Sequence, residues 1–247
     1  MSEQIDVTSP TRPRRVLMVV ANPSVSTTTG WPVGFWASEL THPWLAFTEA
    51  GYEVTIASPA GGRVEADALS DPRDPSGYSA HDIISRGFLE TPHLAALLDD
   101  TPALGALDLS IFDAVVVCGG QSPMFTFRDS TVLQGVIRTF FEAEKPTAAL
   151  CHGVAALVDV QLSDGTFLLE GRTVTGFSNR EEVEADAAAG VPVMAWRIED
   201  EARARGANYV EGGVWKAFAV RDGRLITGQQ QYSGSKTAAL VIAALGS

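Results

Sequence analysis

Cysteine and positive charge are both scarce in this chain of 247 residues. The two cysteines, Cys118 and Cys151, each close an apolar run typical of a buried strand, which is a poor place for a structural disulfide. A reducing, cytoplasmic environment is therefore expected. There are 18 Lys and Arg against 30 Asp and Glu, for a formal net charge of −12. This balance argues against a nucleic-acid partner, because binding phosphates requires a clustered excess of basic residues.

Long apolar runs are also missing. No stretch reaches the roughly 18 apolar residues of a membrane span, and the start, "MSEQIDVTSPTRPRR", lacks the apolar run of a secretory signal. We expect no membrane partner and a short disordered tail over residues 1–14. The whole chain is 45% hydrophobic, so the remaining residues, 15–247, can bury one large core. A single domain is predicted.

Strand-like and helix-like patterns alternate along this domain. Short, mostly apolar runs predict strands at 15–21, 53–59, 111–120, 146–151 and 171–177, and two short strands within 216–228 joined by an Asp222-Gly223 turn. Helical spacing predicts helices at 35–50, 131–145, 152–160, within 192–205 and from Ser233 onward, whereas 60–92 has the composition of a long surface excursion. The alternation predicts an α/β fold, a three-layer sandwich with a mostly parallel sheet between helices.

The segment "TAALCHG" contains the strongest chemical signal. Cys151 stands where a buried strand changes abruptly into a helix, with small residues before it and Gly153 after it. This is the arrangement of a nucleophile elbow, in which strained backbone exposes the side chain to a cleft. Backbone N–H groups at the start of the helix are expected to lower the thiol pKa. The competing interpretation is that Cys151 is a packing residue.

A resemblance to a known family involves five segments. They are "GFWASELTHPWLAFTEAGYEVTIASPAGG", "VVCGGQSPMF", "AALCHGVAAL", "RTVTGFSNREE" and "GRLITGQQQYSGSKTAALVIAAL". In order and spacing they resemble the ThiJ/PfpI superfamily, most closely the branch of glyoxalase III enzymes and heat-shock chaperones. The resemblance covers Arg15 to Leu245 and implies a flavodoxin-like fold shared with class I glutamine amidotransferases.

The resemblance also implies roles for individual residues. Cys151 matches the nucleophile, His152 the general acid and base, and Glu182 the acid that orients the imidazole. Glu181 remains an alternative to Glu182, because a shift of one residue in the loop would exchange them. Glu39 matches a family glutamate that reaches the cysteine sulfur from the first helix. Without the resemblance, these acids would be interpreted as solvated helix residues.

Gly119 and Gly120 end the strand that carries Cys118, where bare backbone can bring an N–H group to a developing oxyanion. The amide of His152 would be the second donor. The family usually has "GGHG" here, but this chain has "GGQS", so Gln121 and Ser122 stand where His and Gly are expected. The change argues against a histidine-based metal site and for an altered substrate pocket.

Other polar and aromatic residues are harder to assign from sequence. His42, His81 and His93 have no metal-ligand spacing, so no metal is expected. The glutamines and tyrosine of residues 229–232 suit either the mouth of a cleft or a polar loop. Five aromatic residues have spacing that suits the core better than a pocket: Trp31, Phe35, Trp36, Trp44 and Phe125.

The resemblance implies a cofactor-independent cysteine enzyme that converts a small reactive carbonyl, such as methylglyoxal, to a hydroxy acid. The resemblance also implies a homodimer that needs no metal, glutathione or nicotinamide. The chain has no G-x-G-x-x-G after an early strand, the pattern that binds a dinucleotide. Two alternatives stay open. One is a thiol-dependent hydrolase or hydratase of an amide, ester or isonitrile, and the other is a stress-response chaperone or redox sensor.

Overall fold

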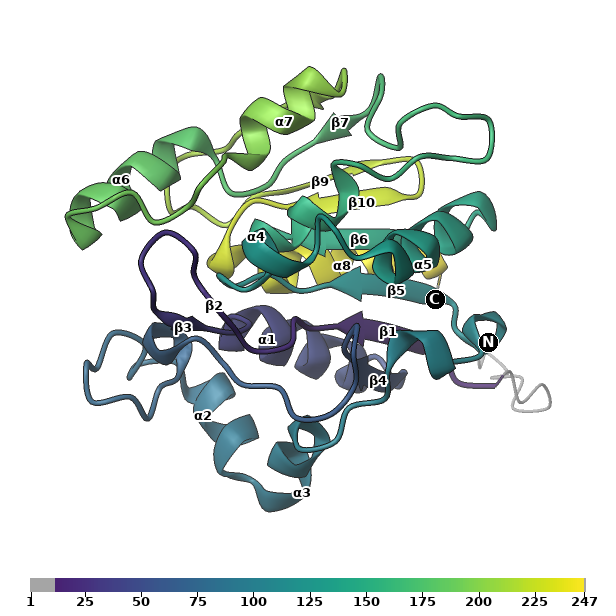
Figure 1. The fold of residues 1–247 in the computed structure, drawn as a ribbon. Coiled ribbons are helices and arrows are strands. Elements are labelled where there is room, and N and C mark those ends of the chain that lie inside the picture. The colour runs from purple at the N-terminus through teal and green to yellow at the C-terminus, as the bar shows by residue number, and fades with distance from the viewer. Residues whose placement is uncertain (1–11, 247) are drawn as a thin grey trace, which may run out of the picture.

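The computed structural model describes residues 12–246, which form an α/β sandwich around a six-stranded sheet. Figure 1 shows helices on both faces of this sheet. The strand order is β4-β1-β5-β6-β10-β9, and every neighbouring pair is parallel except β10 and β9. The strands of this sheet are β1 (Arg15–Val19), β4 (Glu53–Ala57), β5 (Ala114–Val117), β6 (Thr147–Leu150), β9 (Ala219–Asp222) and β10 (Leu225–Gly228). The predicted fold class is confirmed.

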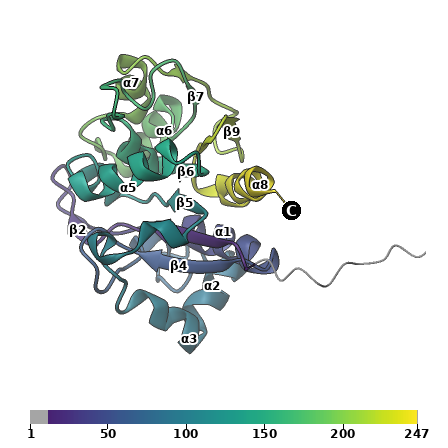
Figure 2. The same ribbon diagram turned by 90° about the vertical axis from the view of Figure 1, so that its right-hand side faces the viewer.

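Side chains alternate between the two faces of the sheet, and each face has its own apolar core. Leu17 and Val19 of β1 face α5 (Thr131–Glu142), whereas Val16 and Met18 face α1 (Ala37–Glu49) and α8 (Gly234–Leu245). Figure 2 shows α5 and α8 on opposite sides of the sheet. The remaining helices are α2 (Ile83–Glu90), α3 (Pro92–Ala95), α4 (Pro123–Thr126), α6 (Asn179–Ala189) and α7 (Ile198–Ala204).

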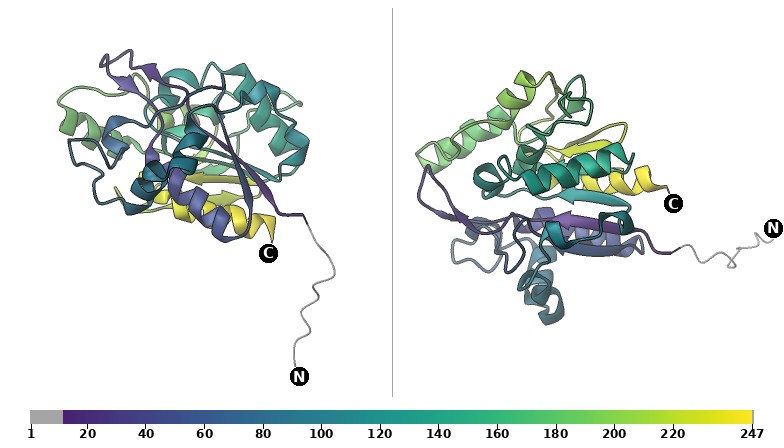
Figure 3. Two further views of the ribbon diagram at one scale, coloured as in Figure 1. Left: turned by 90° about the horizontal axis from the view of Figure 1, so that it is seen from below. Right: turned by 45° about the vertical axis from the view of Figure 1, so that its right-hand side comes forward.

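Two small sheets lie outside the central one. A hairpin of β2 (Ser24–Val25) and β3 (Pro32–Val33) follows β1 inside a segment that the sequence presents only as polar loop. Its loop leans towards α6 (Figure 3), and the Thr28 hydroxyl donates to the carbonyl of Val193, in the loop after that helix, at 2.7 Å. The strand predicted at 171–177 is reduced to β7 (Thr173–Val174), which pairs with β8 (Asn208–Tyr209).

Three further sequence expectations need correction. The hairpin of β9 and β10 turns at Gly223 and Arg224, one residue later than expected. The helix predicted at 152–160 is the 3-10 helix η5 (Cys151–Leu157). The segment 60–92 is not a mere surface excursion, because it contains the 3-10 helix η1 (Ala68–Ser70), helix α2 and the buried residue Asp67. The other 3-10 helices are η2 (Ala96–Leu98), η3 (Leu104–Ala106), η4 (Leu109–Ile111) and η6 (Gln231–Ser233).

The predicted tail falls mostly on residues 1–11, which lie outside the described residues. Residues 12–14 are irregular, and Arg12 forms an ion pair with Asp113 at 2.9 Å. Within residues 12–246, no helix is long and apolar enough to cross a membrane.

Candidate active site

Cys151 sits in a strained turn between β6 and η5. Its φ angle is +54°, in the left-handed region that costs a residue with a side chain roughly 1–3 kcal/mol. Gly153 makes the turn possible, because a methyl group there would lie 2.6 Å from the carbonyl oxygen of Val117. The turn therefore packs directly against β5. The predicted nucleophile elbow is present in the backbone.

His152 lies between the thiol and a carboxyl group. The distance from Cys151 Sγ to His152 Nδ1 is 3.7 Å, and that from His152 Nε2 to Glu182 Oε1 is 3.0 Å. The ring of Phe177 stacks on the imidazole with centroids 4.3 Å apart. All three polar residues are buried, so the imidazole is fixed in orientation by the carboxyl group on one nitrogen and the aromatic ring on its face.

The choice between Glu181 and Glu182 follows from how α6 begins. Ser178 caps this helix and exchanges hydrogen bonds with Glu181 in a capping box. Glu181 Oε1 also accepts from the Gln229 side-chain amide at 2.9 Å and from the Trp215 backbone N–H at 3.0 Å. Glu181 therefore ties α6 to the loop before β9. One residue later, Glu182 faces His152, as the family resemblance implies.

Glu39 reaches the elbow from the first turn of α1. It is fully buried, and its Oε2 accepts a hydrogen bond from the Gly119 N–H at 2.8 Å. Burial raises the pKa of Glu39 to about 8, against the smaller opposing effects of the Cys151 thiol and the Gly119 N–H.

The Gly119 N–H is bonded to Glu39, which corrects the expectation that it faces an oxyanion. Within residues 12–246, the Gly120 N–H has no hydrogen-bond partner, so it remains a candidate donor with that of His152.

The pKa of the Cys151 thiol is also shifted, in the direction opposite to the one that the sequence predicts. Burial raises its pKa, and the negative charge of Glu39 raises it further, outweighing the lowering effect of the His152 N–H. The His152 N–H is therefore too weak an influence to set the protonation state of the Cys151 thiol. A protonated Glu39 removes the repulsion, so the proton positions on Glu39 and Cys151 depend on each other.

Asp67 is a further buried carboxyl group, and sequence reasoning missed it. Its two oxygens accept from the backbone N–H groups of Gly34 at 2.8 Å and of Gln121 at 2.7 Å. Burial raises its pKa to about 7, despite these bonds and the nearby His152. Asp67 joins the segment before α1 to the segment after β5. Its context, "VEADALSDP", has the composition of an exposed loop, so composition contained no signal for it.

A cavity of about 520 Å³ opens above the thiol, at the carboxyl edge of the parallel strands. Gln121 lies on its wall, as the altered "GGQS" segment suggests, and Trp31 and Trp36 line it. Phe35, Trp44 and Phe125 instead pack in or against the core. Among residues 12–246, the lining consists of Trp31, Trp36, Leu69, Tyr78, Gln121, Cys151, His152, Phe177, Glu182, Glu184, Ala185, Ala188, Ala189, Val193, Met194, Trp215 and Gln231.

Residues 229–232 divide between the two roles that the sequence left open. Gln229 and Gln230 are fully buried and bond within the fold, Gln229 to Glu181 and Gln230 to the backbone N–H of Tyr232. Gln231 lines the cavity, whereas Tyr232 lines a smaller neighbouring hollow. Only part of this segment therefore faces a potential ligand.

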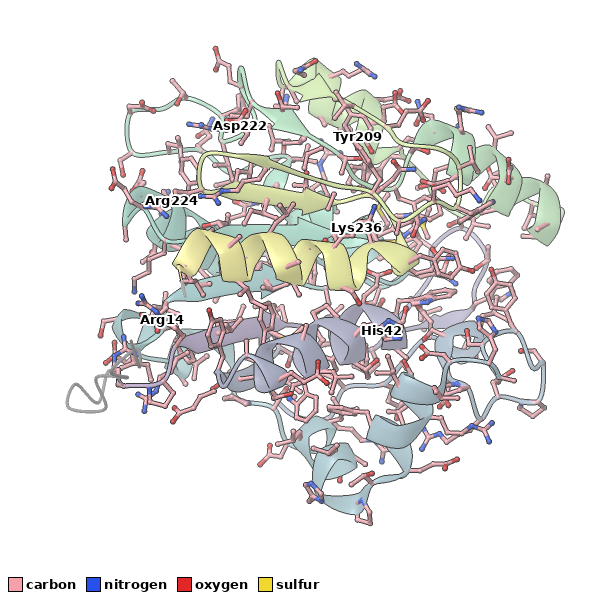
Figure 4. All side chains as sticks on the ribbon, turned by 180° about the vertical axis from the view of Figure 1, so that it is seen from behind. Arg14, His42, Tyr209, Asp222, Arg224 and Lys236 are labelled. Atoms are coloured by element: carbon pink, nitrogen blue, oxygen red, sulfur yellow. The ribbon has the colours of Figure 1, made fainter. Side chains whose placement is uncertain are left out.

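The remaining histidines lie away from the thiol. His42, which Figure 4 labels on α1, has its Nε2 within hydrogen-bond distance of Asp82 Oδ1, at 2.9 Å. His81 belongs to the turn before α2 and His93 to α3. Among residues 12–246, no three His, Cys, Asp or Glu side chains gather in a way that could hold a metal ion.

The fold and this geometry define a class: α/β proteins with a cysteine at a strand-to-helix elbow, beside a histidine and a carboxyl group. The chain belongs to the DJ-1/PfpI family, whose model matches residues 98–243.

Relatives of known name extend the match to nearly the whole chain. The chain is 29% identical to the glutathione-independent glyoxalase HSP31 of Saccharomyces cerevisiae, over 94% of this chain and 98% of that protein. The crystal structure of glyoxalase III from Candida albicans has a TM-score of 0.78 and 26% identity, covering 94% and 97% of the two chains. The Rapid Encystment Protein of 24 kDa from Francisella tularensis has a TM-score of 0.85 and 26% identity, covering 95% and 100%.

Proposed function

We propose that the protein is a glyoxalase III-like lyase that converts small 2-oxoaldehydes such as methylglyoxal to 2-hydroxy acids without glutathione. The observation that carries this proposal is the sequence of contacts from the Cys151 thiol through His152 to Glu182. The similarity to proteins named as glyoxalases supports the substrate class.

In the proposed mechanism, Cys151 Sγ adds to the aldehyde carbon while its proton passes through Glu39 to the carbonyl oxygen, which gives a hemithioacetal. The Glu182 carboxylate accepts from Nε2–H of His152, which leaves Nδ1 as the basic nitrogen that faces the sulfur. His152 removes the proton from the former aldehyde carbon and returns a proton to the neighbouring carbon through an enediol. Water then hydrolyses the resulting thioester and frees the thiol.

Glu39 manages the proton of the nucleophile in this scheme. Its pKa of about 8 keeps its carboxyl group protonated at neutral pH, where it can donate to a thiolate or to the substrate oxygen. The N–H groups of Gly120 and His152 are proposed to stabilise the oxyanion.

The direct test is D-lactate release from methylglyoxal by the purified protein without added metal or thiol. Cys151→Ala should abolish turnover, and Glu182→Ala should lower kcat by about 10²–10⁴-fold while the fold is retained. Cys118→Ala is the matched control, since Cys118 is a buried cysteine of the apolar core facing α1 and α8. Wild-type activity in Cys151→Ala would contradict the proposal.

Two further measurements, combined with the lactate assay, separate the two alternatives. An inactive wild type whose Cys151 is nevertheless alkylated rapidly at neutral pH would redirect the search to amides, esters and isonitriles. A chaperone role is favoured by one observation, the half-exposed apolar side chains of Trp31, Leu69 and Tyr78 at the cavity. Suppression of aggregation that survives Glu182→Ala would support that role.

We also propose that the protein works as a homodimer in the cytoplasm, as the family resemblance implies. Light scattering after size exclusion should give twice the chain mass of 26.2 kDa. Fractionation of the cells that produce the protein should recover it with the cytoplasmic enzymes.

A further inference from the structure

The cavity above Cys151 is much larger than the smallest substrates require. Its volume of about 520 Å³ lies within the roughly 300–1,000 Å³ of pockets that hold drug-sized ligands. A three-carbon ketoaldehyde held by the thiol would occupy only the floor, near Cys151 and His152. Most of the cavity would then contain water against an apolar wall, which is an unfavourable arrangement.

The wall beyond the thiol is built from aromatic and aliphatic side chains. Phe177 and Trp215 meet edge to face with centroids 5.7 Å apart, and Trp36 and Tyr78 meet in the same way at 6.2 Å. Besides Glu182 and Glu184, α6 and the loop after it contribute five aliphatic side chains to the lining: Ala185, Ala188, Ala189, Val193 and Met194. Flat aromatic walls facing small aliphatic side chains favour a ring or a branched apolar group.

The charges around the cavity point to an uncharged ligand. Among the described residues that line it, none is Lys or Arg, whereas Glu182 and Glu184 are both present. Glu184 is held at the rim, where its Oε2 accepts from the indole N–H of Trp215. A phosphate or carboxylate on the substrate would find no cation in this lining and would be repelled by these acids.

We propose that this protein prefers neutral 2-oxoaldehydes with an aromatic or branched apolar substituent over methylglyoxal. The inference rests on the proposed function, because the dicarbonyl group reacts at Cys151 as described there. The substituent lies between the ring of Trp215 and Ala185 of α6. For phenylglyoxal the product is mandelate: the aldehyde carbon is oxidised to the carboxylate, the ketone carbon is reduced to the alcohol, and one water is added.

The test compares kcat/KM for phenylglyoxal and methylglyoxal, with mandelate and lactate measured separately. Wild-type protein should favour phenylglyoxal by at least about 10-fold, and 4-carboxyphenylglyoxal should be at least about 10-fold poorer than phenylglyoxal. Ala185→Phe fills the space proposed for the ring, so the ratio of phenylglyoxal to methylglyoxal should fall at least about 10-fold. The matched control is Ala187→Phe, at an exposed alanine of the same helix outside the described lining.

Comparing the phenylglyoxal-to-methylglyoxal ratio of kcat/KM between Ala185→Phe and the wild type cancels the difference in intrinsic reactivity between the two aldehydes. Turnover of methylglyoxal with no preference for phenylglyoxal, or a ratio that Ala185→Phe leaves unchanged, would overturn the inference and leave the proposed function standing. Turnover of neither aldehyde would overturn the proposed function and the inference together. An equal loss of the ratio in Ala187→Phe would assign the effect to a disturbed α6, and would also overturn the inference.

Discussion

In the candidate site, Glu39 and Cys151 are neighbouring groups whose pKa values are both raised. Burial favours the neutral form of both groups, and the negative charge of Glu39 raises the pKa of the thiol. Either group ionises more easily when the other is neutral. A carboxyl group with this environment makes the stability of the protein depend on pH.

Glu39→Gln should remove one component of that pH dependence. Because the pKa of Glu39 rises from 4.5 to about 8 on folding, its protonation stabilises the fold fully below pH 4.5, and this contribution is lost as the pH rises through 8. The stability of the wild type relative to Glu39→Gln should therefore fall by a few kcal/mol between pH 4.5 and 8. Urea unfolding across this range measures it, and a constant difference would show that Glu39 is already ionised at low pH.

The adjacent acids Glu181 and Glu182 should respond differently to replacement by alanine. Glu181→Ala removes the acceptor for Gln229, Trp215 and Ser178 at once, and each buried donor left unpaired costs about 1–3 kcal/mol. Glu182→Ala unpairs only one ring nitrogen of His152. Denaturation should therefore show a loss larger by at least about 2 kcal/mol for Glu181→Ala, and equal losses would contradict the division of roles.

At the scale of elements, the site depends on how closely β5, β6 and α1 approach each other at their ends. The Trp36 N–H donates to the carbonyl of Gly119 at 3.0 Å, so the start of α1 lies directly against the end of the strand. Gly120 has a φ angle of +113° in this contact. The approach is what places Glu39 beside the elbow.

Gly120→Ala should be strongly destabilising for this reason. Its new methyl group would lie 2.4 Å from the backbone nitrogen of Trp36, in a backbone conformation that disfavours side chains. We expect a loss of at least about 3 kcal/mol in the free energy of unfolding. Gly135→Ala, inside α5 and with no described atom within 4 Å of the new methyl group, should gain about 0.5–1 kcal/mol. Similar melting temperatures for both variants would refute the proposed crowding.

The whole molecule carries an excess of negative charge, with a formal net charge of −12. Like charges repel across a compact surface, and the range of that repulsion falls from about 30 Å at 0.01 M salt to about 8 Å at 0.15 M. Tm should therefore rise as NaCl is added over this range. The surface ion pairs, such as Arg15 with Glu53, weaken under the same conditions, so a falling Tm would show that paired charges outweigh the repulsion.

Several elements of the molecule were predictable from local sequence alone. The apolar runs predict β1, β5 and β6, because a strand buried on both faces needs no polar alternation. The β-branched residues of "EVTIA" predict the edge strand β4. The small residues around Cys151 predict the elbow, since a strained turn packed against β5 leaves no room for side chains. Matching segments, rather than local pattern, identified His152, Glu182 and Glu39.

Other properties of the site depend on residues that are distant in the sequence. Asp67 contacts Gly34 and Gln121, and its local context resembles an exposed loop. The Gly119 N–H is bonded to a carboxyl group from another element. The thiol pKa depends on burial and on Glu39 together, which only packing determines.

The sequence by itself therefore determined the class of fold, the elbow and the identity of the residues that meet there, because these depend on local periodicity, turn chemistry and matched motifs. The tertiary structure settled the choice between Glu182, which the family resemblance favours, and its alternative Glu181. It alone decided which N–H groups are already bonded and how large and apolar the cavity is. The physical reason is that burial, electrostatic interaction and cavity shape arise from groups brought together by folding.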